Sequence, residues 1–139
     1  MDEIAAEALI RALLTGSGLL PNNTPVEPVP YDADGVYPAV VYKCVNANVD
    51  TIEIGADIVF STLDFQVTVT AQGNNCAHLI QYIKGIHNSL NKKGGTNSYG
   101  TINMISRVRP FTQPYQSKDG SVWQNVGYVF RVRVQGNYS

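Results

Sequence analysis

The stretch that decides the fold is "DFQVTVTAQGNNCAHLIQYIKGIHNSL", residues 64–90, because its hydrophobic period changes midway. As far as Ala71, apolar and polar residues alternate, which is typical of a strand. After Asn75 the apolar residues recur every three or four positions, which is typical of an amphipathic helix. The sequence therefore predicts a strand over Asp57–Ala71, with one buried face and one face that is wet or covered by a partner. A helix is predicted over Asn75–Lys93.

The buried face of this helix follows from a rotation of about 100° per residue. The residues that share one face are Cys76, Leu79, Ile80, Ile83, His87 and Leu90. We expect Leu79, Ile80, Ile83 and Leu90 to pack on the apolar face of the sheet.

The flanking segments supply the remaining elements. In chain order we expect a helix over Glu3–Thr15, an irregular connection with four prolines over 17–36 and a strand over 37–45. A turn at 46–50 and a short strand over 51–54 follow. After the central helix we expect a long hairpin over 99–135, with its turn near Lys118–Gly120. The order αββαββ predicts a single α+β domain over residues 1–139. Its architecture would be an antiparallel β-sheet of about four strands with helices packed on one face.

The charged residues are few and unevenly divided along the chain. They make up 15% of the sequence, which is low for a globular domain. Residues 1–83 hold ten acids and two bases (−8), and residues 84–139 hold eight bases and one acid (+7), which together give the net charge of −1. This polarity suits head-to-tail association between copies, and it equally suits neutralisation inside one fold.

The sequence predicts neither secretion nor a membrane span. The start, "MDEIAAEALIRALL", lacks a basic region, and no apolar run approaches the length that crosses a bilayer. Cys44 and Cys76 form no C-x-x-C pattern, so we expect two reduced thiols.

No set of residues predicts catalysis, a metal site or a cofactor. The strand–helix junction "QGNN" has one glycine and no lysine, which does not suffice for a phosphate loop, and "KKGGTNSYG" follows a helix instead of preceding one. His78 and His87 lie about 180° apart on their helix and cannot share a ligand. Cys76 is three turns from His87, so only Cys44 could pair with that histidine as a nucleophile and base.

The strongest local signal is a pair of R-x-R motifs, which we call the arginine strip: Arg107, Arg109, Arg131 and Arg133. Residues two apart on a strand share a face, and the hairpin register predicts that all four share the face opposite the core. Neighbouring like charges repel, so an anionic partner would stabilise this arrangement. The partner could be an acidic surface of another subunit or nucleic acid, and internal acids such as Asp64 are the alternative. We therefore predict an assembly interface at the arginine strip.

The order of these pieces resembles the tail terminator, or tail-completion, proteins of long-tailed bacteriophages. The resemblance rests on the helix "AAEALIRALL", the proline-containing connection into "YPAVVY", the strand "DFQVTVTAQ" that runs into the helix "AHLIQYIKGIHNSL", and the closing strand "GYVFRVRVQ". It spans nearly the whole chain. It implies a non-enzymatic α+β virion protein of the phage neck and tail.

The resemblance also implies partners. Such proteins form homo-oligomeric, hexameric rings that cap the tail tube protein and join it to the head-neck connector proteins, with DNA passing through the ring lumen and no contact with a membrane. Two alternatives remain: another neck or tail component, such as a connector stopper or a tube-like subunit, which would more often be mostly β, and a small ligand-binding or hydrolase domain. The absence of a predicted set of catalytic or ligand-binding polar residues argues against the ligand-binding or hydrolase domain.

Overall fold

The structure is a computed structural model that describes residues 2–29, 35–51, 58–73 and 77–137. Its elements, in chain order, are α1 (Asp2–Gly16), β1 (Val26–Pro28), β2 (Ala39–Thr51), β3 (Ile58–Gln72), the 3₁₀ turn η1 (Ala77–Leu79), α2 (Ile80–Leu90), β4 (Gly95–Asn97), β5 (Gly100–Gln116) and β6 (Val122–Asn137).

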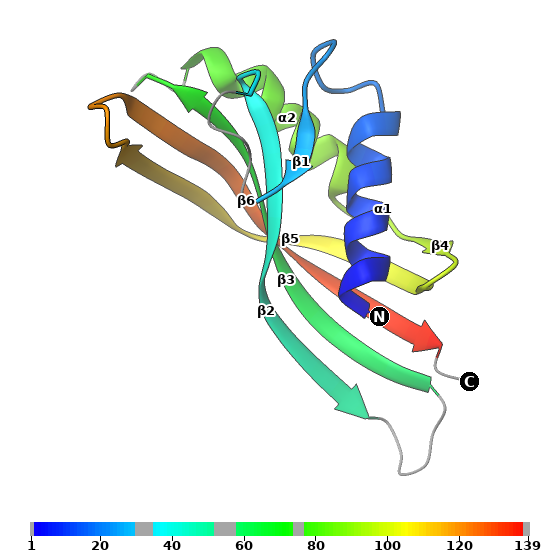
Figure 1. The fold of residues 1–139 in the computed structure, drawn as a ribbon. Coiled ribbons are helices and arrows are strands. Elements are labelled where there is room, and N and C mark those ends of the chain that lie inside the picture. Colours follow the sequence, from blue (N-terminus) through cyan, green and yellow to red (C-terminus); the bar gives the residue numbers. More distant parts are fainter. Residues whose placement is uncertain (1, 30–34, 52–57, 74–76, 138–139) are drawn as a thin grey trace.

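The strands of the described residues form one six-stranded sheet in the order β1-β2-β3-β6-β5-β4. β1 runs parallel to β2, and every other neighbouring pair is antiparallel. The sheet is curled, and α1 lies inside the curl (Figure 1), where it contacts β1, β4, β5 and β6. The hairpin formed by β5 and β6 extends beyond this curl as an arm.

The predicted fold class is wrong. Instead of an antiparallel sheet of about four strands with helices packed on one face, the described chain forms a mixed, curled sheet of six strands with two short helices. Two short edge strands were missed: β1 lies inside the segment predicted as an irregular connection, and β4 inside the glycine-rich segment. Each has only three residues, so their pairing depends on tertiary contacts more than on a local pattern.

The turn predicted at residues 46–50 is also wrong. β2 continues through it to Thr51 and accommodates the extra residue in a β-bulge between Cys44 and Asn46. The short strand expected over 51–54 lies almost entirely outside the described residues. The N-terminal helix and the long hairpin were predicted correctly, and the chain reverses between β5 and β6 at residues 117–121.

Between Leu63 and Ala71, β3 is buried on both faces, so the prediction of a wet or partner-covered face is wrong there. Its odd positions, such as Phe65 and Val67, lie in the hydrophobic core. Its even positions are buried too: Asp64, Gln66, Thr68 and Thr70 are each at most 8% exposed. The polar side chains of this face have neighbours on β6: Asp64 pairs with Arg131, and the hydroxyl of Thr70 donates to Asn125 Oδ1.

Gly127 makes the tight crossing of β3 and β6 possible. It pairs with Thr68 in the middle of both strands. A Cβ atom at this position would overlap the backbone oxygen of Val67 and lie 2.8 Å from the Cα of Thr68. Only a glycine allows this approach of the two backbones, and it therefore supports the strong coil of the sheet.

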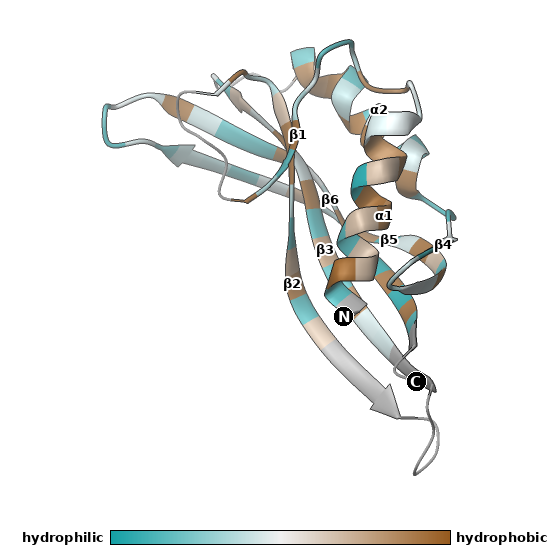
Figure 2. Cartoon of the chain, turned by 45° about the vertical axis from the view of Figure 1, so that its right-hand side comes forward, coloured by the Kyte–Doolittle hydropathy of each residue, from teal (hydrophilic) through white to brown (hydrophobic). Residues whose placement is uncertain are grey.

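The core fills the space between α1 and the inner side of the curl. Its largest fully buried side chains on the sheet are Phe65 and Phe130, and α1 contributes Ile10 and Leu14. Figure 2 shows apolar residues, in brown, along both helices and along the strands. The end of α1 is joined to α2 by a hydrogen bond of 2.8 Å between the hydroxyls of Ser17 and Ser89.

The phase of α2 differs from the prediction. Leu79 and Leu90 are buried as expected, but Ile80 is 49% exposed and Ile83 is only partly buried. Ile86 is fully buried instead. The chain enters the helix through the 3₁₀ turn η1, whose tighter winding rotates the face that an α-helical count predicts.

Candidate assembly surfaces

The structure divides the arginine strip between the two faces of the sheet. Residues opposite each other on antiparallel strands point to the same face. Arg107 lies opposite Phe130, whose side chain is in the core, whereas Arg109 lies opposite Val129 on the outer face. A β-bulge at Val108 separates them and reverses the alternation of side chains. The predicted stacking of all four arginines on one face is therefore wrong.

Three of the four arginines do share the outer face. In the register of β6 with β3, Arg131 lies opposite Asp64 and Arg133 lies opposite Thr62. Both arginine side chains therefore point away from the core, as that of Arg109 does. The side chains of all three are exposed. The assembly interface predicted for the arginine strip stays a prediction.

Arg131 has an internal partner. Its Nε donates to Asp64 Oδ1 at 3.0 Å and its Nη2 to Oδ2 at 3.4 Å. The Asp64 side chain is only 11% exposed, while that of Arg131 is 54% exposed. The hydrogen bond to Asp64, followed by the attraction between the charges, raises the pKa of Arg131 above its usual value. At Arg131, the arginine strip is thus partnered by an internal acid, which was the alternative to an external anionic partner.

Arg107 has a different environment on the inner face. Its guanidinium carbon lies 5.1 Å from the centre of the Tyr128 ring, which in turn lies 5.7 Å from the ring of His87. Its backbone N–H donates to Asn91 Oδ1 at 3.1 Å. Arg107 therefore sits at the junction between β5 and the end of α2, and its side chain is exposed.

The candidate nucleophile–base pair of Cys44 and His87 is not assembled. The thiol of Cys44 donates to the carbonyl of Asn46 at 3.4 Å, and burial, followed by the charge of Glu3, raises its pKa. A raised pKa disfavours the thiolate that acts as a nucleophile. Cys76 lies outside the described residues. Within the described part of the chain, no group of three or more His, Cys, Asp or Glu side chains could hold a metal ion.

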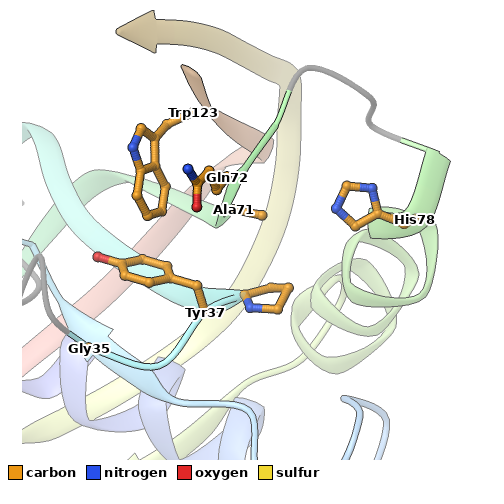
Figure 3. Close-up of a pocket in the computed structure, with 7 residues that line it drawn as sticks. Gly35, Tyr37, Ala71, Gln72, His78 and Trp123 are labelled. Atoms are coloured by element: carbon orange, nitrogen blue, oxygen red, sulfur yellow. The ribbon is translucent and has the colours of Figure 1, made fainter. Parts of the chain in front are cut away.

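Sequence reasoning missed an aromatic pocket of about 480 Å³ (Figure 3). It is lined by Gly35, Tyr37, Pro38, Ala71, Gln72, His78 and Trp123. The rings of Tyr37 and Trp123 meet edge to face at 4.7 Å between centres, and Tyr115 stacks on Trp123 at 6.4 Å. The lining offers aromatic faces, an amide and one imidazole, but neither carboxylate nor thiol. The single tryptophan of the sequence was the signal that could have pointed to it.

Sequence reasoning also missed the role of Lys92 and Lys93, which it treated only as the end of a helix. Lys92 N–H donates to Ile105 O, and Ile105 N–H donates to Lys93 O, each at 2.7 Å. These bonds attach the two lysines to the outer edge of β5, close to Arg107. A basic cluster therefore forms from two segments that are distant in the sequence.

The fold is similar to that of a protein chain in a solved virion. That structure is described as the virion of a native gene transfer agent particle; the two chains superpose with a TM-score of 0.60 and are 18% identical, over 96% of this chain and 93% of the other. No family model matches the sequence, and no curated protein does. In the described residues, no helix is long and apolar enough to cross a membrane.

Proposed function

We propose that this chain is a structural protein of a bacteriophage-like virion. The observation that carries the proposal is the likeness in fold to a virion chain, which covers nearly the full length of both proteins. The proposed role is non-enzymatic, and the absence of an assembled nucleophile–base pair at Cys44 and His87 is compatible with it. The expected location of the protein is the assembled particle.

Within the virion we propose the role of a tail terminator: a ring, expected to be a hexamer, that caps the tail tube and joins it to the neck. The whole-chain resemblance of the sequence to tail terminator proteins supports this choice. So does the polarity of charge along the chain, which favours head-to-tail contacts between identical subunits. The partners would be the tail tube protein and the head-neck connector proteins.

A tube-like subunit or a connector stopper is the second candidate. It is favoured by the dominance of the sheet, because β2, β3, β5 and β6 make up half of the described residues and the helices are short. The two candidates differ in what the particle lacks when the protein is absent. Without a terminator the tube polymerises without control of its length, whereas without a tube subunit no tube forms.

Electron microscopy of particles assembled without this protein tests both candidates. We expect tubes of irregular length that are not attached to filled heads. Heads without any tube would indicate a tube subunit, and finished tails beside leaking heads would indicate a stopper. Normal particles of normal length would contradict a structural role of any kind.

We also propose that the outer-face arginines contribute to assembly, against a neighbouring subunit, a partner protein or DNA in the lumen. Arg109→Glu with Arg133→Glu tests this without breaking the pair of Arg131 with Asp64. We expect the double variant to fold and to assemble poorly. Lys118→Glu, an exposed charge at the tip of the hairpin, is the control for a change of net charge. If the double variant assembles as well as the parent protein and the Lys118→Glu control, the proposal is contradicted.

A further inference from the structure

We infer that neighbouring copies of this chain join through two oppositely charged edges of the sheet. The acidic edge lies along β1 and β2, and the basic edge lies along β5. The inference rests on the proposed ring and names the surfaces that would close it.

The acidic edge combines α1 with the first two strands. Burial is the largest cause of the raised pKa of the Tyr42 hydroxyl on β2. The negative charges of Glu7 and Glu27, which lie near it, raise this pKa further. Glu3 acts in the same way on the thiol of Cys44, two residues further along β2. Arg11 lies 3.9 Å from Glu27, and the exposed Lys43 of β2 is the second base at this edge. The three carboxylates at this edge therefore outnumber its two bases.

The basic edge combines the end of α2 with β5. It consists of Lys92, Lys93 and Arg107, which are all exposed and are attached to one another through the backbone bonds of Ile105 and the side chain of Asn91. The sequence from residue 84 onward contains one acid, Asp119, and this residue lies at the distant tip of the hairpin. The cluster thus carries three positive charges and no nearby acid from its own half of the chain.

No salt bridge of the described residues joins the two edges within one subunit. β1 and β2 stand at one end of the strand order, and β5 with the short β4 at the other. In the described residues, the salt bridges join Arg11 to Glu27 and Arg131 to Asp64, and neither spans the edges. A contact between different surfaces of identical subunits is heterologous, and it closes into a ring when the rotation permits.

Apolar side chains accompany the charges at both edges. Ile4 and Val45 are 47% and 42% exposed beside the acidic edge, and Val108 is 40% exposed beside Arg107. Exposed apolar groups inside a charged rim are typical of surfaces that bind another protein.

Side chains, not strand addition, would make the contact. Opposite Ile105 the backbone of β5 is already bonded to Lys92 and Lys93. Further along, Pro110 and Pro114 pair with β6 and have no N–H group to offer an approaching strand. The partner is therefore recognised by charge and shape, which sets the orientation and register of the subunits.

Complementation between two variants of the full chain tests the inference. One variant reverses the acidic edge (Glu3→Lys, Glu7→Lys, Glu27→Lys), and the other reverses the basic edge (Lys92→Glu, Lys93→Glu, Arg107→Glu). Each variant alone presents like charges at both edges, so we expect ring association to weaken at least about tenfold. An equimolar mixture presents opposite charges at every contact and should form rings in which the two variants alternate. Native mass spectrometry of the mixture, with one variant bearing a mass tag, measures this 1:1 composition.

The control variants keep the test independent of folding. Lys92→Glu with Lys93→Glu, and Glu3→Lys with Glu7→Lys, change only charges near the surface and should show the same complementation to a smaller degree. Rings from either triple variant alone, or a mixture no more associated than its components, would overturn the edge contact while leaving the proposed ring intact. A parent protein that stays monomeric at every concentration would instead refute the ring and, with it, this inference.

Discussion

Arg131 and Asp64 form a two-point ion pair across β6 and β3, with Nε 3.0 Å from Oδ1 and Nη2 3.4 Å from Oδ2. The carboxylate is almost buried and the guanidinium covers it from the solvent side. The charge of Arg131 is therefore used within the subunit, where it satisfies an acid on the central strand of the sheet.

We expect Arg131→Ala to lower the midpoint of thermal unfolding, because it leaves the carboxylate of Asp64 without its donor. Arg109→Ala, which removes an exposed charge from the same face, should leave the midpoint nearly unchanged. A double-mutant cycle with Asp64→Ala measures the coupling. A coupling of zero between Asp64 and Arg131 would mean that the pair contributes nothing to folding.

The phase of α2 can be tested with two isoleucines. Ile86→Ala should cost about 2–5 kcal/mol of unfolding free energy, since it empties a fully buried site. Ile80→Ala should change it by less than about 0.5 kcal/mol, since this side chain is largely exposed. Chemical denaturation of both variants provides the comparison. The reverse order of the two effects would show that the helix is rotated from the position described.

Gly127→Ala should prevent the native crossing of β3 and β6, because the added methyl group would overlap the backbone of Val67. We expect a variant that unfolds at a much lower temperature or does not accumulate as folded protein. Gly16→Ala is the matched control, since a Cβ there meets nothing within 4 Å. Circular dichroism during heating would reveal the contrast. Equal midpoints for the two variants would contradict the close approach of the strands.

The hairpin tip should depend on acid pH through Asp119. Hydrogen bonds from the hydroxyls of Ser117 and Ser121, and from the N–H of Ser121, lower its pKa from 3.8 to about 2. Because the folded pKa is depressed, the stabilisation of the tip is complete above pH 3.8 and is lost as the pH falls through about 2. The protection of the Ser121 amide against exchange, relative to its intrinsic rate at each pH, should therefore fall over this window. In Asp119→Asn this pH-dependent loss of protection should disappear, whereas Lys118→Gln should retain it.

The sequence contains enough information for the long elements but not for the register of the sheet. The alternation in residues 64–71 and the helical period after it correctly predicted a strand followed by a helix. The same alternation could not reveal the bulge at Val108, because a single extra residue reverses every side chain beyond it without changing the composition of the strand. For this reason Arg107 and Arg109 were assigned to one face although they occupy two.

The candidate surfaces were predictable only in part for a related reason. Charge counts identified an acidic and a basic half of the chain, but the strand order that places them at opposite edges depends on contacts between distant segments. β1 illustrates the difficulty. Its residues, "VEP", lie between prolines and have no strand pattern of their own, and they become a strand only because β2 is beside them.

Pro110 and Pro114 also bear on the tendency of the free protein to aggregate. A long exposed strand at the side of a sheet can seed stacking of many copies into insoluble fibres. Two missing N–H groups along β5 interrupt such a ladder, which disfavours aggregation through this strand. The same two prolines thereby limit edge-to-edge pairing between copies of the hairpin arm of β5 and β6.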